Sequence, residues 1–370
     1  MGKVVVVGAG KTGRGFLGRL LKEAGREILF IDRDQKLVDA LNEARSFTVH
    51  FFGDGREPLR VDHFQAAAWE NASFEDAELI LVSVGGQNLP DVGKSMAGLL
   101  DESRHYTVIT CENASHPSAL LKAAVGKSNI SVSEATVFCT TIEGEGLDIR
   151  SEDYPCLQCD GDLLEGYEPG IRQIRPFPQF SNFLTRKLYT YNAASCVIAY
   201  LGWIKGYENY GDAANDEEIL ALLDRNYQAT NRALCREFGY DEGDQEEFAL
   251  LSRKKFCDRT IADTISRNAR DPQRKLAAGE RIIGPIRLLL QYGEDASVLE
   301  KTAAAALLYT APQEKAWTKL RAEKSSGQIL EEICKVGREE IIFSDIMNYI
   351  DRFEEILRTG NRVPGAMYHL

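Results

Sequence analysis

The chain has 370 residues, enough for two or three domains with sizeable hydrophobic cores. Hydrophobic residues make up 44% and charged residues 27%, a globular composition that argues against disorder. The net charge of −12 argues against a nucleic-acid partner, and no apolar run reaches the roughly 20 residues that a membrane span needs. The first residues lack a signal-peptide pattern and the eight cysteines are scattered, so we expect a cytoplasmic protein with reduced thiols.

Short β-branched runs alternate with amphipathic stretches over about the first 140 residues. Five runs are predicted to be buried strands: Val4–Val7, Ile28–Ile31, Leu79–Val84, Val108–Cys111 and Ile130–Val137. Helices are predicted between several of them, as at Phe16–Ala24 and Leu37–Ala44, and residues 50–70 are expected to form an extra strand pair or a loop. Near-continuous apolar strands separated by helices predict an α/β Rossmann fold, a doubly wound and mostly parallel sheet covered on both faces.

The pattern changes after residue 140. Glycines and prolines are frequent over residues 143–180, where we expect a loop and a crossover. The remainder is helical in pattern; in Asn215–Phe238 apolar residues form one face, Asn215 resembles a cap and Gly239 a stop. Further helices are predicted at 280–292, 296–309, 328–336 and 340–357. The sequence therefore predicts a Rossmann domain over residues 1–182 and an all-α C-terminal domain over residues 183–370.

The first predicted strand leads into the turn GAGKTG at residues 8–13 and then into a helix. Gly8 permits a tight turn, Gly10 lets the backbone approach a pyrophosphate, and Gly13 allows the helix to pack closely on the strand. The helix N-terminus offers N–H groups to the anion. The second strand ends at Asp32, whose carboxylate suits the ribose hydroxyls of NAD and repels the 2′-phosphate of NADP. Arg33 keeps NADP open as an alternative.

A second group of polar residues begins the helical half. Lys187 and Asn192 are five residues apart, at the start of an apolar stretch that continues to Trp203. In an α-helix Asn192 would lie roughly 140° round from Lys187, with Ser195 between them, so all three can face one cleft. A desolvated lysine can act as a base near neutrality, and an asparagine amide can donate to an oxygen that gains charge. Spacing alone favours the plainer interpretation, a solvated lysine and a capping asparagine.

Four segments form a more specific combination: GAGKTGRGFLGRLL at 8–21, CEN at 111–113, RKLYTYNAASCVIAYLG at 186–202 and DPQRKLAAGERIIGP at 271–285. Together they resemble the polyol-specific long-chain dehydrogenases, the mannitol dehydrogenase family, over nearly the whole chain. Members of this family are zinc-independent enzymes in which a hydride moves between NAD and a sugar-chain carbonyl, with a lysine as acid/base.

The resemblance implies roles for individual residues. Lys187 would be the acid/base, and Asn192 and Asn113 would polarise the substrate oxygen. Ser195, which replaces a histidine of the family, joins the catalytic set if its hydroxyl offsets that loss; the alternative is weaker positioning of the substrate oxygen. The residues expected to hold a phosphate or a hydroxyl-rich chain are Arg274, Lys275 and Arg281. The residues expected to contact the cofactor are Gly8, Gly10, Lys11, Thr12, Gly13, Asp32, Arg33, Gly85 and Asn113.

Four positions depart from the family pattern. Ser195 stands where the family has a histidine, and Gly284 where it has a lysine. Thr140 and Thr141 replace an aspartate and an arginine. The paired loss of those two charges indicates a reshaped substrate pocket.

We therefore expect an NAD-dependent oxidoreductase that interconverts a phosphopolyol such as mannitol 1-phosphate and the ketose fructose 6-phosphate, as a monomer or homodimer. One alternative is an oxidoreductase for a sugar acid such as a hexuronate, or for an unphosphorylated polyol. Another is a family member with weakened catalysis that acts as an NAD(H)-binding protein. No metal is expected, since Cys156 and Cys159 form a lone CxxC, which more simply represents two ordinary thiols.

Overall fold

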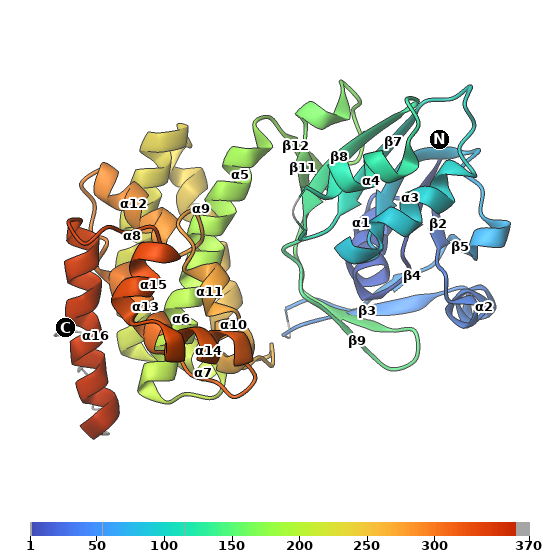
Figure 1. The fold of residues 1–370 in the computed structure, drawn as a ribbon. Coiled ribbons are helices and arrows are strands. Elements are labelled where there is room, and N and C mark those ends of the chain that lie inside the picture. The colour runs from blue at the N-terminus through green and yellow to red at the C-terminus, as the bar shows by residue number, and fades with distance from the viewer. Residues whose placement is uncertain (1, 54, 115, 360–370) are drawn as a thin grey trace. The chain divides into compact units, whose positions relative to one another are not determined.

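The computed structural model describes residues 2–53, 55–114 and 116–359 (Figure 1). The chain divides into two units, Met1–Phe183 and a second that begins at Leu184, with the boundary inside α5 (Phe180–Lys187). Residues 360–370 of the predicted helical domain lie outside the described residues. Of the helices that are described, none is long and apolar enough to cross a membrane.

An eight-stranded sheet forms the centre of the first unit, with the strand order β12-β11-β8-β7-β6-β1-β2-β5. Its strands are β1 (Lys3–Val7), β2 (Ile28–Ile31), β5 (Phe64–Ala67), β6 (Ala77–Val82), β7 (Tyr106–Cys111), β8 (Ile130–Thr136), β11 (Leu157–Asp160) and β12 (Ile174–Phe177). All neighbouring strands are parallel except β8 and β11. The predicted mostly parallel Rossmann sheet is confirmed.

Helices cover both faces of this sheet. They are η1 (Gly13–Gly18), α1 (Arg19–Glu23), α2 (Gln35–Ala44), η2 (Trp69–Asn71), η3 (Gly86–Asn88), α3 (Leu89–Ala97), α4 (Pro117–Val125) and η4 (Asp162–Leu164). Val4 and Val6 of β1 share a core with side chains of η1 and α1. Val5 and Val7 share a second core with side chains of α3 and α4. Because successive side chains of a strand point to opposite faces, β1 is buried on both sides, which explains its run of four valines.

A smaller four-stranded sheet has the order β4-β3-β10-β9. Its strands are β3 (Phe47–Phe51), β4 (Leu59–Val61), β9 (Thr141–Glu143) and β10 (Ile149–Ser151). The antiparallel pair of β3 and β4 confirms the extra strand pair expected near residues 50–70. The expectation of only loop and crossover over 143–180 was wrong, because β10, β11 and β12 lie there. Strands of three or four residues are too short to show a clear alternation in sequence.

The second unit is helical throughout its described part. After α5 come η5 (Leu188–Asn192), α6 (Ala193–Lys205), α7 (Tyr210–Ala214), α8 (Glu217–Phe238), α9 (Glu242–Cys257), α10 (Ile265–Ala269), α11 (Pro272–Lys275), α12 (Ile283–Gln291), α13 (Ser297–Leu308), α14 (Lys315–Glu323), α15 (Ser326–Glu332) and α16 (Ile341–Thr359). Asp216 caps α8, not Asn215 as predicted, and Gly239 ends it as predicted with a φ of 72°. The predicted all-α C-terminal domain is confirmed, and α6 lies buried within its core.

Candidate active site

The glycine turn has the geometry expected of a phosphate-binding loop. Gly8 has a φ of +97°, a conformation that side chains rarely adopt. A Cβ on Gly13 would lie 1.9 Å from the Gly8 carbonyl oxygen, so this glycine lets η1 pack on the turn. A Cβ on Gly10 would meet no atom within 4 Å and would project into open space. The turn is therefore tight where the chain packs and open where a pyrophosphate would approach.

Asp32 lies beside this turn, at the carboxyl end of β2. Its carboxylate accepts hydrogen bonds from the main-chain N–H of Ala9 at 2.7 Å and of Asp34 at 3.0 Å. The neighbouring Arg33 and the turn residue Lys11 are both exposed. Asp32 thus joins the glycine turn to the end of the second strand.

Gly85 lies just beyond β6, at the same edge of the sheet as the glycine turn. Its φ is +87°, and its N–H donates to the Glu112 carboxylate at 2.7 Å. The same oxygen accepts the N–H of Val84 at 2.6 Å. Burial raises the pKa of Glu112 against these two hydrogen bonds. Sequence reasoning did not assign Glu112 a function, although it belongs to the CEN segment that carries the family resemblance.

Asn113 follows β7 and connects it to the end of β8. Its Nδ2 donates to the Val137 carbonyl at 2.9 Å, and its Oδ1 accepts the Val137 N–H at 3.1 Å and the Thr136 hydroxyl at 3.3 Å. Asn113 is exposed at the carboxyl edge of the sheet.

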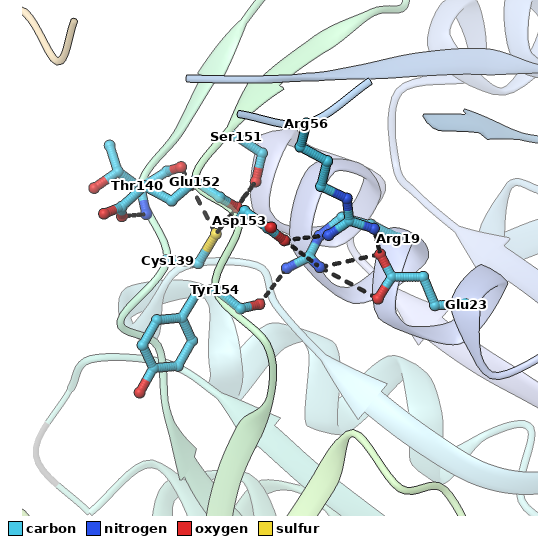
Figure 2. A network of polar contacts seen from close by, with 9 residues as sticks. All are labelled: Arg19, Glu23, Arg56, Cys139, Thr140, Ser151, Glu152, Asp153 and Tyr154. Atoms are coloured by element: carbon cyan, nitrogen blue, oxygen red, sulfur yellow. Dashed lines mark hydrogen bonds and ion pairs between the residues drawn. The ribbon is translucent and has the colours of Figure 1, made fainter. Parts of the chain in front are cut away.

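The segment that departs from the family at Thr140 and Thr141 is held from two sides. The Glu152 carboxylate accepts the N–H of Thr140, and the Cys139 thiol lies 3.2 Å from the hydroxyl of the neighbouring buried residue Ser151 (Figure 2). The Thr141 hydroxyl lies 3.5 Å from that of Thr12, which belongs to the glycine turn. The two threonines therefore border the predicted cofactor loop, and Glu152 supplies a carboxylate beside them.

A charged network fixes the chain immediately after Glu152 (Figure 2). Arg19 of α1 is completely buried, donates to the Tyr154 carbonyl and pairs with Glu23 at 3.2 Å. Arg56 bridges the carboxylates of Glu23 and Asp153. This network connects α1 to the residues that precede β11, and so holds the main chain next to Glu152 in place.

In the second unit, the predicted pair Lys187 and Asn192 spans a π-helical turn rather than an α-helical one. Lys187 precedes η5 and Asn192 ends it. Five residues is the hydrogen-bonding interval of a π-helix, so the two side chains lie nearer to one face than the ~140° of an α-helix would place them. The Asn192 amide makes no hydrogen bond to a described residue. It is therefore available to a ligand.

Lys187 is only partly exposed and lies in a positive environment. Desolvation by burial lowers the pKa of its ammonium group to about 7, and the positive charges of Lys255 and Arg281 lower it further in the same direction. Because the pKa lies near neutrality, the group can both accept and donate a proton at physiological pH. Lys255 was not predicted, since only the fold brings α9 beside α5.

Ser195 and Lys275 both contact Asn268, a residue that the sequence did not single out. The Ser195 hydroxyl accepts a hydrogen bond from Tyr210 at 3.3 Å and lies 3.5 Å from Oδ1 of Asn268. Lys275 is buried, with its ammonium on the Asn268 carbonyl and 5.6 Å from the Tyr200 ring. Burial lowers the pKa of Lys275. This position favours a structural role for Lys275 between α10 and α11 over direct contact with a phosphate.

Arg274 and Arg281 lie on either side of Glu280. Arg281 donates to Glu280 at 3.0 Å, and Arg274 lies 3.8 Å from the same carboxylate. Arg274 also pairs with Asp271 at 2.6 Å. Each guanidinium has further N–H donors, so an anionic substrate group would share them with these carboxylates.

Gly284 stands where the family has a lysine. The space beside it is occupied by Tyr189 of η5. A Cβ at Gly284 would lie 2.4 Å from the hydroxyl oxygen of Tyr189 and 3.0 Å from the Gly279 carbonyl. The glycine is therefore what allows Tyr189 to adopt its place. The departure at Gly284 therefore goes together with the close packing of Tyr189 against this backbone.

All eight cysteines are free thiols, including Cys156 and Cys159, which are both buried. Burial raises the pKa of both thiols, for Cys159 to about 12. Within residues 2–53, 55–114 and 116–359, no three His, Cys, Asp or Glu side chains are grouped as a metal site.

Two family models match the chain, one to each half. The mannitol dehydrogenase Rossmann domain matches residues 2–142, and the mannitol dehydrogenase C-terminal domain matches residues 179–357. Among solved structures, Pseudomonas fluorescens mannitol 2-dehydrogenase in complex with NAD and D-mannitol is 14% identical with a TM-score of 0.66, covering 99% of this chain and 94% of its own. A D-sorbitol dehydrogenase is 13% identical with a TM-score of 0.75, covering 97% and 94%. At these identities the structures establish a shared fold.

Curated relatives are more similar in sequence. Mannitol-1-phosphate 5-dehydrogenase from Paenarthrobacter aurescens is 30% identical over 330 residues, 83% of this chain and 86% of the relative. The enzyme of the same name from Pseudarthrobacter chlorophenolicus is 29% identical over 360 residues, 90% and 92% of the two chains. The matched domains lie in both units, and the predicted resemblance is confirmed. This chain belongs to the mannitol dehydrogenase family of oxidoreductases.

Proposed function

We propose that this protein is an NAD-dependent dehydrogenase that interconverts a phosphopolyol of the mannitol 1-phosphate type and a ketose such as fructose 6-phosphate. The observation that carries the proposal is Lys187, whose pKa is lowered to about 7 at the start of a π turn that ends at Asn192. The shared name of the curated relatives supports the substrate class.

The glycine turn and Asp32 fit NAD. The open side of Gly10 leaves room for a pyrophosphate, and the Asp32 carboxylate, fixed by Ala9, suits the ribose hydroxyls and disfavours a 2′-phosphate. When bound, the nicotinamide ring accepts a hydride from the polyol or returns it to the ketose. We accordingly assign cofactor binding to the domain over residues 1–182 and substrate chemistry to that over 183–370.

Lys187 would carry the proton, without a metal. In polyol oxidation its neutral amine accepts the proton of the reacting hydroxyl at Nζ, and in ketose reduction its ammonium returns one. The Asn192 amide would donate a hydrogen bond to the same oxygen as negative charge develops there. Eight free thiols are consistent with work in the reducing cytoplasm.

A second candidate substrate class is an unphosphorylated polyol or a sugar acid such as a hexuronate. Arg274 and Arg281, the residues expected to hold a phosphate, already contact Asp271 and Glu280. A dianionic phosphate would have to share those guanidiniums with the carboxylates, whereas a hydroxyl-rich or monoanionic chain would meet less competition.

The test is the oxidation of NADH, and separately of NADPH, by the purified protein with fructose 6-phosphate, other phosphorylated ketoses, fructose and hexuronates. We expect turnover with NADH and fructose 6-phosphate, and its loss in Lys187→Ala with NADH binding retained. Turnover on hexuronates or fructose alone would select the second class. NADH binding without turnover on any member would favour a cofactor-binding protein with weakened catalysis, and turnover by Lys187→Ala would refute the role of the lysine.

A further inference from the structure

One buried side chain holds the chain on both sides of Lys187. Gln245, near the start of α9, is fully buried and uses both ends of its amide. Its Oε1 accepts Nε of Arg186 at 2.6 Å. Its Nε2 donates to the Thr190 hydroxyl at 3.2 Å and to Oδ1 of Asn231 at 2.9 Å. One residue of α9 therefore binds the side chains immediately before the lysine and within the π turn after it.

Arg186 is in turn firmly held. It is 3% exposed, and its guanidinium lies 4.6 Å from the centre of the Tyr240 ring and 4.3 Å from that of Phe248. It pairs with the Asp244 carboxylate at 2.8 Å and donates to the Asp244 carbonyl at 2.8 Å. The Asp244 carboxylate thus neutralises the Arg186 guanidinium, and these contacts leave the Arg186 side chain little freedom. Its hydrogen bond to Gln245 therefore fixes α5 relative to α9.

Thr190 provides the second anchor, at the middle of η5. It is completely buried, and its hydroxyl receives the Gln245 amide. A π turn is much rarer than an α turn and is maintained only where its surroundings support it. Relaxation of η5 to an α-helix would rotate Asn192 away from Lys187. The bonds of Gln245 hold the chain just before this turn and at its middle, and so oppose that rotation.

We propose that Gln245 is the positioning residue of the acid/base lysine: its bonds to Arg186 and Thr190 fix the register of η5 and so hold Lys187 and Asn192 on one face. The inference rests on the proposed function of Lys187 and adds a residue to it. Gln245 touches no reacting atom; it acts through the chain on either side of the lysine.

The decisive variant is Gln245→Met, which keeps the length of the side chain and removes both hydrogen-bonding ends without adding charge. We expect kcat for NADH-dependent ketose reduction to fall about ten- to a hundredfold, the range that a small misplacement of a catalytic group produces. The KM for NADH should not change, because the glycine turn belongs to the other unit. Thr190→Val should reduce kcat in the same way, and Thr190→Ser, which keeps the hydroxyl, should retain it.

Ser252→Ala is the matched control. Ser252 lies on the same helix, is completely buried and donates to the Ala249 carbonyl at 2.9 Å, so its loss should lower the melting temperature without reducing kcat. The effects of Gln245→Met and Thr190→Val on kcat should be strongly non-additive, because each change removes the hydrogen bond that joins these two residues. If Gln245→Met lowered the melting temperature but left kcat unchanged, as is expected of Ser252→Ala, the proposed positioning role of Gln245 would be wrong.

A second readout does not require turnover. The pH dependence of Lys187 acetylation by acetic anhydride, followed by peptide mass spectrometry, reports the state of the amine directly. The wild-type midpoint should lie near 7 and move up toward the ordinary ~10.4 of lysine in Gln245→Met, with Lys255 and Arg281 unchanged. A shifted midpoint in a protein that reduces no ketose would refute the proposed function and keep the positioning role, whereas an unshifted midpoint in an active protein would refute the positioning role alone.

Discussion

At the scale of single residues, Gly10 and Gly13 are only three positions apart but face different surroundings. A methyl group on Gly10 would enter open space, whereas one on Gly13 would lie 1.9 Å from the Gly8 carbonyl oxygen. We expect Gly10→Ala to keep the wild-type melting temperature and to lose at least tenfold in NADH affinity, about 1.4 kcal/mol. Gly13→Ala should lower the melting temperature even without cofactor. Thermal melts with and without NADH check both, and equal behaviour of the two variants would contradict the assigned geometry.

Lys187 predicts opposite pH profiles for the two directions of the reaction. Oxidation needs the neutral amine, so its kcat should rise as pH increases through about 7. Reduction needs the ammonium ion, so its kcat should fall over the same interval. Steady-state rates from pH 5.5 to 9 in both directions measure this, with Lys187→Arg as a variant whose charge stays fixed. Parallel profiles in the two directions would exclude Lys187 as the titrating group.

The residues that sequence reasoning found and missed differ in a physical way. The geometry of Gly8, Gly10 and Gly13 was predictable because it depends on local sterics along a few residues. Gln245 and Asn268 were not, because their contacts are with residues tens of positions away that only the fold brings close. A glutamine inside an acidic stretch carries no sequence signal for burial.

At the scale of elements, the positions of the buried strands and amphipathic helices were predicted, with bounds that differ from the observed ones by up to four residues. The prediction of Ile28–Ile31 coincides with β2, and the helix over 296–309 with α13. The small sheet was missed where three-residue strands such as β10 are paired by distant partners. The π turn η5 was missed as well, because the spacing of apolar residues around it differs too little from that of an α-helix.

Glu300, in the middle of α13, predicts how the stability of the helical unit depends on pH. Burial raises its pKa to about 7, and the charge of Asp345 on α16 adds to the rise. The folded protein therefore binds this proton more tightly than the unfolded chain. The free energy of unfolding should fall by about 2–3 kcal/mol as pH rises from about 4.5 through 7.

Glu300→Gln tests this dependence. A neutral side chain of the same shape should flatten that part of the stability curve in urea melts at several pH values. The matched change on α16, Glu355→Gln, replaces an exposed carboxylate and should leave the curve unchanged. A wild-type curve that rises over this interval would show that Glu300 is not the controlling group.

At the scale of the whole molecule, the eight thiols give a simple measure of how it is packed. Only Cys235 and Cys257 are partly exposed, and the other six cysteines are buried. Burial raises the pKa of thiols such as Cys334, to about 12, so the reactive thiolate is scarce. Ellman's reagent should therefore react rapidly with at most two thiols in the native protein and with eight in denaturant. The double variant Cys235→Ser, Cys257→Ser should lose the rapid phase, and fewer than eight thiols after unfolding would reveal a disulfide.

The π turn between Lys187 and Asn192 also links catalysis to the length of the chain. A π turn contains one residue more than an α turn, so deletion of a single codon within η5 would let the helix become regular. The deletion would leave the lysine and the asparagine four residues apart, which is about 40° round a regular α-helix, so the two side chains would still share a face. The π turn thus does at a spacing of five residues what an α turn does at a spacing of four. Between relatives, a one-residue gap at this point in an alignment would therefore mark chains that present the same two residue types from a regular helix.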